Sequence, residues 1–451
     1  MASTPGGSSA LILTQSKPLR LLTLLLFYFT QGFPLGLFYA AIPGWMGFNG
    51  ATTGEIAGVV AASGLPWSLK LVNGFLIDRY TFLPMGRRRS WIIGAQSVIV
   101  LVLLVGAVLA PAHDDIFMLS AIGFVANMAV TFQDVGIDSL AVDIMAEDER
   151  AKAAGIMFGA QALGTAAATF MGGMLLANYG ISVCLAGVAL VPALVAIYGM
   201  IIREREGERR LPWSAGQSHP LNRAVQVESW WPLLVNAWKA MILPLSLMLI
   251  PMLLLRSLPA GAFEAFNPVL YTQIGGWSLI EYTNYSSVLG LVLGLIGLTV
   301  GGWAVDAIGA QRSALISVSI GVLLLVGFGA ISHLWAQSWL LIGFGSAMDF
   351  VALFYAIAMI PICMRMCNPA VAATQFTIYM AIGNFGRPLG AWLAAKTAGV
   401  GLPEWMYWSL ALAWAIVAVS LLIARFPKQN SASEETAHIL PQGDGLQPIE
   451  N

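Results

Sequence analysis

Two aspartates that could carry protons lie inside one strongly apolar segment of the chain. Asp134 and Asp138 are four residues apart, so a helix presents both on the same face. Two carboxylates close together and away from water favour the uptake of a proton by one of them. The alternative is a fixed ion pair with Lys70, which interrupts another apolar segment. Charges in such segments are costly and therefore functional candidates, and the sequence leaves both interpretations open.

Ionisable groups also interrupt the apolar segments of the C-terminal part. Asp349 and Glu264 are further candidates for proton binding. Arg256 and Arg387 could hold a carboxylate or phosphate, because a guanidinium group binds oxyanions through paired hydrogen bonds. The alternative is internal pairing, of Arg256 with Glu264 or of Arg387 with Asp349. The remaining candidates for binding a polar solute are Gln31, Lys70, Gln133, Gln375 and Asn384.

Other residue types point to a passage and away from catalysis. Four scattered His and three Cys show no metal-ligand spacing, so neither a metal nor a cofactor is expected. The chain has no glycine-rich phosphate loop ending in Lys and no Ser/His/Asp cluster, so an enzyme is not expected either. Deep aromatic side chains that could line a passage are Tyr39, Trp67, Tyr355 and Tyr379.

The segments that carry these residues are too apolar for a water-soluble protein. Of the 451 residues, 58% are hydrophobic and 10% are charged, whereas soluble domains carry about a quarter of charged residues. The net charge of −1 offers no basis for binding nucleic acid. The composition predicts an integral protein of the lipid bilayer.

Twelve apolar stretches are long enough to cross a bilayer core of about 30 Å. They are continuously apolar without a period of two, which indicates helices and an all-α membrane protein. Lys and Arg gather in the tails and in alternate loops, so both termini are expected in the cytoplasm. The predicted spans are 19–46, 54–78, 90–110, 116–145, 151–177, 181–202, 238–273, 284–305, 313–332, 336–362, 371–396 and 405–425.

A polar stretch divides the twelve predicted helices into two bundles of six. It mixes Arg, Glu, Pro, Ser and Gln after the sixth span and reads as a linker. Because one chain holds both bundles, it is expected to function as a monomer. The predicted parts are a cytoplasmic tail at 1–18, a six-helix bundle at 19–202, a cytoplasmic linker at 203–237, a second six-helix bundle at 238–426 and a disordered cytoplasmic tail at 427–451.

The two halves repeat the same markers. Thr52 with Glu55, and Ser278 with Glu281, have the spacing of a capping box at the start of a helix. An aspartate then closes each of these spans at nearly the same distance along both halves. Duplicated six-helix halves are the plan of a secondary transporter, which moves a solute by alternating access.

The loop after each of these spans has the pattern Gly-x-x-x-Asp-x-x-Gly-x-x-basic, interrupted in the first copy, and resembles the signature of the major facilitator superfamily. We interpret both loops as conformational latches, since their charges can pair in one state and separate in another. A plain anchor of basic residues is the alternative. The latch candidates are Gly74, Asp78, Arg79, Arg87, Arg88, Arg89, Asp306 and Arg312. In that superfamily the fifth and eighth spans face each other, and here both carry Gly-x-x-x-Gly.

Further segments resemble one branch of this superfamily, the bacterial anhydromuropeptide permeases and acetyl-CoA transporters, with siderophore permeases nearby. The matching segments are 31–37, 65–71, 86–91, 133–138, 373–376 and 386–387. The resemblance implies proton-coupled import of a bulky, muropeptide-like solute across the bacterial inner membrane. It makes Lys70, Asp134, Asp138, Gln375 and Arg387 counterparts of intramembrane family positions.

Two departures from that branch weaken the case for a strongly anionic solute. Ala141 and the segment 161–164 stand where muropeptide permeases carry basic residues. A less anionic, amide-containing solute such as an iron-siderophore chelate is therefore one alternative. A second alternative is a drug or metabolite antiporter that exports its solute, because helices alone do not determine the direction of transport.

Overall fold

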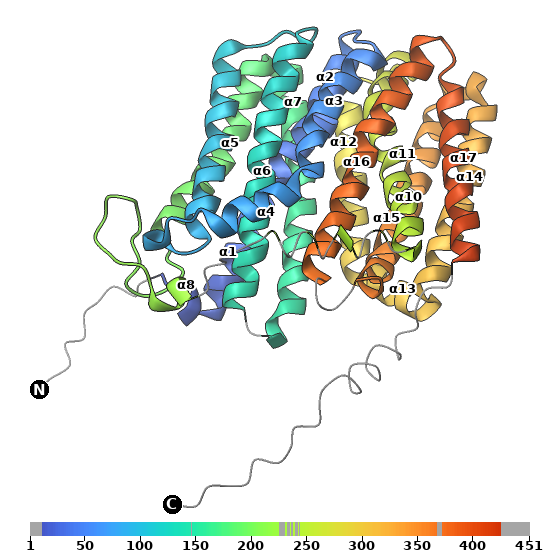
Figure 1. The fold of residues 1–451 in the computed structure, drawn as a ribbon. Coiled ribbons are helices and arrows are strands. Elements are labelled where there is room, and N and C mark those ends of the chain that lie inside the picture. Colours follow the sequence, from blue (N-terminus) through green and yellow to red (C-terminus); the bar gives the residue numbers. More distant parts are fainter. Residues whose placement is uncertain are drawn as a thin grey trace, which may run out of the picture.

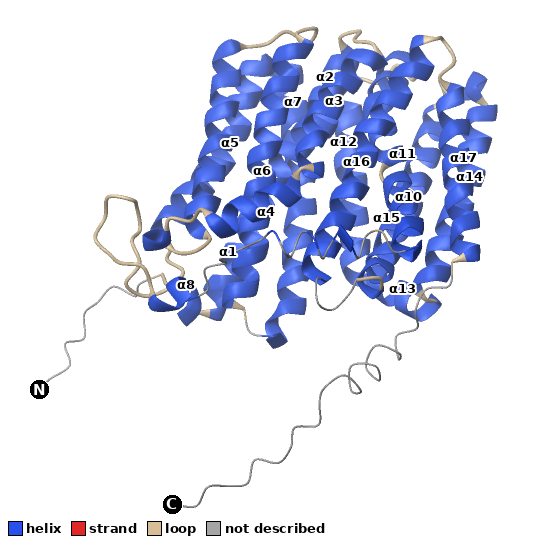
Figure 2. Cartoon of the chain, viewed as in Figure 1, coloured by secondary structure: helices blue, strands red, loops and turns tan. Residues whose placement is uncertain are grey.

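The computed structural model describes residues 11–424 apart from 146, 225–230, 232–234, 236–237, 240–241, 243 and 368–371. Both ends of the chain, including the tail predicted to be disordered, and most of 225–237 lie outside the described residues. Within the described part the regular elements are helices, which run roughly parallel and overlap in depth (Figure 2).

The N-terminal half contains the helices that cross the membrane first. Its first span runs without interruption through α1 (Lys17–Gly36), a π-helical turn η2 (Leu37–Ala41) and α2 (Ile42–Phe48). The others are α3 (Thr53–Ser68), α4 (Lys70–Arg79), α5 (Arg89–Leu109), α6 (Ile116–Ile144) and α7 (Glu147–Ile201), and the short elements are η1 (Leu13–Gln15), η3 (Leu83–Met85) and α8 (Pro220–Ala224).

The C-terminal half repeats this order. Its first span combines α10 (Pro244–Arg256), α11 (Leu258–Val269) and η4 (Leu270–Ile274), and its second combines α12 (Leu279–Ile296), η5 (Gly297–Gly301) and α13 (Gly302–Ile308). The rest are α14 (Ala310–Ala330), η6 (Ser332–Leu334), α15 (Ser338–Arg365), α16 (Ala372–Gly399) and α17 (Glu404–Ile423).

The described helices account for the twelve predicted spans. Nine are long and apolar enough to cross a membrane, and the bent pair α3–α4 makes a tenth. The helix α7 is a hairpin of two spans, because Gly180 breaks it with a φ of 79°. Accordingly, Cys184 Sγ lies 3.7 Å from Gly172 O, whereas twelve residues of straight helix extend about 18 Å. The 28-residue α16 is the twelfth.

The two halves lie side by side, with α1–α7 on one side of the molecule and α10–α17 on the other (Figure 1). Between them, α3 packs on α16 and α7 packs on α12. The predicted approach of the fifth and eighth spans is confirmed, since a Cβ on Gly294 would meet Ala162 and one on Gly159 would meet Leu298. Small residues therefore let these two helices pack closely.

Both capping boxes are present, which supports the duplication read from the sequence. The Thr52 N–H donates to Glu55 at 2.7 Å, and the Ser278 N–H donates to Glu281 at 2.8 Å. In each half the helix after the box ends in a loop with the repeated glycine and aspartate. The end at which α1 begins and α17 ends is called the terminal end below; the boxes lie at the opposite end.

Candidate proton and solute sites

A charged cluster lies within the N-terminal half, between α4, α6 and α1. The Lys70 ammonium group forms an ion pair with Asp134 and lies 3.6 Å from Asp138 Oδ2. The Tyr28 hydroxyl donates to Asp138. The pairing with Lys70 considered from the sequence is therefore present, and one lysine is shared by two carboxylates.

The local structure explains how Lys70 reaches these carboxylates. Pro66 lies near the end of α3, and the chain bends by 49° before α4 continues the span. Proline cannot donate an N–H and disturbs the preceding turn of a helix, so a bend at this point is expected. Lys70 is the first residue of α4. One turn further along α4, the Asn73 side chain donates to the Thr131 hydroxyl at 2.7 Å and holds α4 against α6.

The two aspartates differ in their access to solvent. The side chain of Asp134 is 6% exposed, that of Lys70 is 22% exposed and that of Asp138 is 46% exposed. Asp138 also lies one turn nearer to the terminal end on α6. A proton that enters from that end would therefore reach Asp138 before Asp134.

A cavity of about 480 Å³ lies between the halves. Its walls come from the first, second and fifth spans of one half and from the seventh, eighth, tenth and eleventh spans of the other. The lining residues are Leu35, Gly36, Tyr39, Ala40, Gly64, Trp67, Gln161, Thr165, Thr169, Glu264, Ser286, Asp349, Asn384 and Arg387. This volume lies within the range of pockets that hold drug-sized organic ligands, and the mixture of polar and aromatic walls suits a polar one.

Arg387 is the basic residue of this cavity, and it is held from both halves. Its Nη1 lies 3.3 Å from Glu264 Oε1. Its guanidinium carbon lies 4.3 Å from the centre of the Tyr39 ring, a cation–π contact across the interface. The observed pair joins Arg387 to Glu264, so both internal pairings considered from the sequence, Arg256 with Glu264 and Arg387 with Asp349, are wrong.

Amide groups complete the polar lining. The Asn384 amide donates to the Trp67 carbonyl at 3.3 Å and so connects α16 to the bend of the second span. Gln161 donates to the Gln31 side chain at 2.9 Å. From the sequence, Gln161 was notable only as a replacement of a basic residue. Its role at the wall was missed because Gln is common in polar helix faces and carries no pattern of its own.

Seven of the predicted binding and lining residues do not line this cavity: Gln31, Lys70, Gln133, Arg256, Gln375, Tyr355 and Tyr379. Gln133 is buried against α1, where it donates to the Phe27 carbonyl at 3.1 Å. Arg256 packs beside Gly383 in the C-terminal half. Gln375 donates to the Tyr379 hydroxyl at 2.7 Å near the terminal end. Tyr355 donates to the Met252 carbonyl. These contacts support the helices within each half.

The halves are tied together at the end opposite the termini. Gln273 donates to the Gly47 carbonyl at 2.8 Å and to the Ala51 carbonyl at 2.9 Å. A Cβ on Gly44 would collide with the Tyr282 ring, and one on Gly47 would collide with Pro268. Among the described residues, no hydrogen bond or ion pair joins the halves at the terminal end. The structure is therefore closed at the opposite end.

Comparison with known proteins agrees with this architecture. The family model of the Major Facilitator Superfamily matches residues 24–391. The chain belongs to the major facilitator superfamily. It is accordingly a multi-pass membrane transporter and not an enzyme.

The chain is similar to individual members at low sequence identity. It is 24% identical over 386 residues to the anhydromuropeptide permease of Escherichia coli K12, which covers 82% of this chain and 73% of that protein. It is 29% identical over 127 residues to an uncharacterised protein of Haemophilus influenzae, covering 27% of this chain and 28% of that protein. Crystal structures of the nucleoside transporter NupG and a point variant show the same fold, with TM-scores of 0.66 and 0.63, 14% identity, and coverage of 89% of this chain and 98% of theirs.

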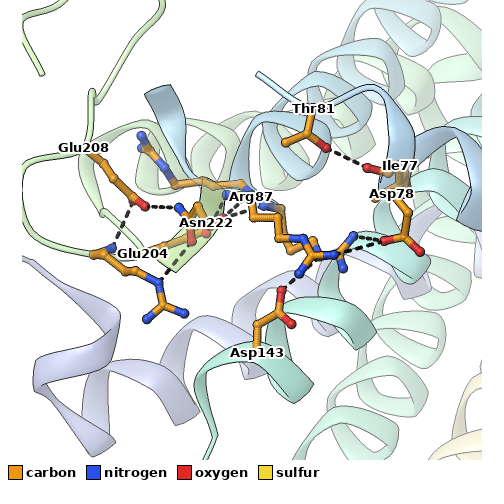
Figure 3. Close-up of polar contacts among 11 residues, drawn as sticks. Ile77, Asp78, Thr81, Arg87, Asp143, Glu204, Glu208 and Asn222 are labelled. Atoms are coloured by element: carbon orange, nitrogen blue, oxygen red, sulfur yellow. Dashed lines mark hydrogen bonds and ion pairs between the residues drawn. The ribbon is translucent and has the colours of Figure 1, made fainter. Parts of the chain in front are cut away.

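The superfamily signature after the second span forms a network at the terminal end (Figure 3). Arg88 donates to Asp78 at 2.6 Å and to Asp143 on α6 at 3.1 Å. Arg87 lies 3.8 Å from Asp78, and Arg79 lies over the ring of Tyr80. The loop therefore holds the ends of α4, α5 and α6 together.

A glutamate beyond the sixth span completes this network. Glu204 accepts the backbone N–H groups of Arg87 and Arg88 at 2.8 Å each and that of Arg89 at 2.5 Å. These are unpaired donors at the start of α5, where a negative charge is also favoured. In return, the Arg89 side chain donates to the carbonyls of Gly199 and Ile202 at the end of α7.

Burial perturbs the ionisation of this glutamate. Burial and the neighbouring Glu208 raise the pKa of Glu204 to about 7, although the three N–H groups oppose the shift. Burial also raises the pKa of Glu208, which accepts from Asn222 at 2.7 Å (Figure 3). This residue pair was not singled out from the sequence, because the run of Arg and Glu in 203–210 reads equally well as a solvated linker.

Proposed function

We propose that this protein imports a bulky polar solute across the bacterial inner membrane and couples import to the entry of protons. The observation that carries the proposal is the shared Lys70 ammonium group between Asp134 and Asp138 within the membrane. Such a cluster can exchange one ion pair for another when a carboxylate takes up a proton. The resemblance to a permease for muropeptides supports import and the inner membrane as its location.

The bend of the second span offers a physical link between proton and solute. Lys70 lies one turn after Trp67, and the bend occurs at Leu69, between α3 and α4. Trp67 lines the cavity, and its carbonyl accepts from Asn384 of the other half. Protonation of Asp138 would remove one of the two negative partners of Lys70. Lys70 would then pair with Asp134 alone, and its shift would move the bend. The wall of the cavity and its contact with α16 would shift with it.

The cavity walls suit a solute with many hydrogen-bonding groups. Gln161, Thr165 and Asn384 present amides and a hydroxyl, and Tyr39 and Trp67 present rings that sugars or other flat polar groups can cover. Arg387 is already paired with Glu264, so only part of its charge is available to an anion. This favours a muropeptide-like solute with few net charges.

A siderophore chelate is the second candidate, and Gln161 is the observation that favours it. An amide lines the cavity at a position where the resemblance to muropeptide permeases implies a basic residue. Amides bind the carbonyl and hydroxamate-type oxygens of a neutral chelate without demanding a negative charge.

The energy for uptake would come from the membrane potential and the proton gradient. One charge that crosses a potential of 100 mV supplies about 2.3 kcal/mol, which corresponds to nearly fiftyfold accumulation. If the termini lie in the cytoplasm, the closed end of this structure faces outward, and the exposed side chain of Asp138 faces the cytoplasm. The proton would leave there after the solute. The single chain holds both halves of the cavity, which supports function as a monomer.

Purified protein in liposomes with an imposed pH gradient tests the proposal. Uptake of muropeptides, siderophore chelates and CoA esters is measured with both directions of the gradient. Wild type should accumulate one class only when protons flow in with it. Asp134→Asn should abolish accumulation but retain exchange of labelled for unlabelled solute, whereas Glu404→Gln, at the start of α17 and away from both sites, should accumulate normally. Accumulation by Asp134→Asn at the wild-type level, or accumulation driven by proton flow in the opposite sense, would overturn proton-coupled import.

A further inference from the structure

A second, smaller pocket adjoins the central cavity within the C-terminal half. It measures about 100 Å³, and Asp349 and Ser286 line both spaces. The remaining walls come from α11, η4, α12 and α15; half of their residues are aromatic, and Asn267 adds an amide. The aromatic lining residues are Phe263, Tyr271, Tyr282, Tyr285 and Phe344. The pocket is therefore a side chamber of the cavity, with a carboxylate at its entrance.

The aromatic walls are fixed in place by their own contacts. The rings of Tyr271 and Tyr285 are stacked, with centroids 5.6 Å apart and an interplanar angle of 27°. Tyr271 donates its hydroxyl proton to Leu341 O at 3.0 Å, and Tyr285 donates to Ile342 O at 3.2 Å. Because a phenol has one proton to give, these tyrosines offer a guest mainly the π electrons of their rings.

Asp349 has no fixed positive partner in the described part of the chain. No Lys or Arg nitrogen there lies within 4 Å of its carboxylate, and the nearby Arg387 is paired with Glu264 at 3.3 Å. A carboxylate in a water-poor space is stabilised by an opposite charge or by a proton. A positive partner for Asp349 would therefore have to come from a bound molecule.

We propose that the side pocket binds an ammonium group of the transported solute. The positive charge would pair with Asp349 and lie against the tyrosine rings, whose faces attract cations more strongly when solvent is excluded. The small pocket holds the ammonium head, and the larger polar body of the solute lies in the 480 Å³ cavity. The solute is thus a polar molecule with an exposed amine. This inference rests on the proposed function and gives Asp349 the role of a solute ligand.

The same walls do not suit a metal ion. Hard cations such as Mg²⁺ and Ca²⁺ take six or more oxygen ligands and are usually held by several carboxylates, whereas this pocket supplies one carboxylate beside the neutral side chains of Asn267, Ser286 and the tyrosines. In addition, the described residues contain no group of three His, Cys, Asp or Glu side chains that could hold a metal. An organic ammonium group, which needs one counter-charge and a soft surface, is the cation that fits.

The pocket also contacts the closed end of the transporter. Tyr282 lines the pocket, and its ring packs against Gly44 of the other half so closely that a Cβ there would collide with it. An ammonium group in the pocket would lie beside the residue that seals the halves. Its binding is therefore expected to strengthen closure at the opposite end and to raise the stability of this state.

Choline and its uncharged isostere dimethylbutanol test the charge requirement directly. Binding to the purified protein in detergent is measured by calorimetry, without any gradient. Choline should bind, and the neutral isostere, which has nearly the same shape, should bind at least about tenfold more weakly. Equal affinity for the two probes would overturn the inference, since the pocket would then recognise shape and not charge.

Variants of the pocket locate the binding. Asp349→Asn should weaken choline binding about tenfold or more, and Tyr285→Leu about threefold to tenfold. Tyr285→Phe, which keeps the ring, should bind like wild type, as should Glu404→Gln at the start of α17, outside the pocket and the cavity. Wild-type affinity in Asp349→Asn, or an equal loss in Glu404→Gln, would contradict the assignment. Thermal unfolding confirms that each variant is folded.

The outcome is separate from the test of transport. Choline binding that requires Asp349, together with transport that ignores the proton gradient, would overturn proton coupling alone. Proton-driven transport by a protein that does not distinguish choline from its isostere would overturn the ammonium pocket alone.

Discussion

The two copies of the duplicated loop share a glycine with a positive φ but differ in length and surroundings. Gly86 and Gly309 have φ values of 102° and 93°, just before the third span of their half. In the first copy, which is longer and contains η3, Arg88 connects Asp78 to Asp143. In the second, Asp306 and Arg312 form no ion pair with any residue that the structure describes. The repeated motif thus provides the glycine turn, and residues outside the motif determine whether the loop is locked.

The partners that lock the first copy come from distant parts of the chain. Asp143 belongs to the fourth span, and Glu204 follows the sixth. In the second half a neutral side chain performs one of the same tasks: Gln311 donates to the carbonyls of Leu421 and Ala424 at the end of α17, as Arg89 does at the end of α7. The charged version of the loop therefore combines helix capping with ion pairing, whereas the second keeps the capping.

Replacement of the turn glycines should give the largest contrast. A Cβ on Gly86 would meet the Glu204 carboxyl group at 2.5 Å, whereas a Cβ on Gly309 would meet nothing within 4 Å. In both Gly86→Ala and Gly309→Ala an alanine must adopt a positive φ, which lowers the free energy of unfolding by about 1–3 kcal/mol. Gly86→Ala should lose about 2 kcal/mol more, because Glu204 must leave three N–H groups. Thermal unfolding in detergent measures both, and equal losses would contradict the difference between the loops.

Removal of the loop arginines should give a smaller contrast. Arg88 is buried and bonded to two partly exposed carboxylates, so Arg88→Ala should destabilise the protein by about 1–2 kcal/mol. The free energy of unfolding of Arg312→Ala should lie within about 0.5 kcal/mol of the wild-type value, as expected for a surface change. Paired unfolding curves of the two variants measure this contrast. If Arg312→Ala costs as much as Arg88→Ala, the second loop is locked as well.

The smallest expected effect is a dependence of stability on pH. The pKa of Glu204 is raised from its ordinary 4.5 to about 7 in the folded protein, so the folded state holds a proton that the unfolded state has released. Stability that depends on this proton is present below about pH 4.5 and is lost as the pH rises toward 7. Gln cannot release a proton, so the melting temperature of Glu204→Gln should fall less than that of wild type when the pH is raised from 5 to 7. Parallel curves for the two proteins would show that Glu204 does not cause the slope.

The sequence predicted the architecture because that architecture follows from one-dimensional patterns. Apolar length, alternating basic loops and repeated capping boxes each depend on residues close together in the chain, and the bilayer allows few solutions for them. The shared face of Asp134 and Asp138 also follows from helical periodicity, whereas their pairing with Lys70 was one of two interpretations that the sequence left open. The fold was therefore accessible without coordinates, and the charged cluster only in part.

The tertiary structure decided which distant groups meet. It paired Arg387 with Glu264 and with the Tyr39 ring, where the sequence had suggested Asp349 as the partner of Arg387. It brought Glu204 to the start of α5 and placed tyrosines from η4 and α12 in the same pocket as Asp349. The physical reason is that a helix displays a residue in a known direction, but the rotation and bend of each helix against its neighbours depend on packing that no local pattern encodes.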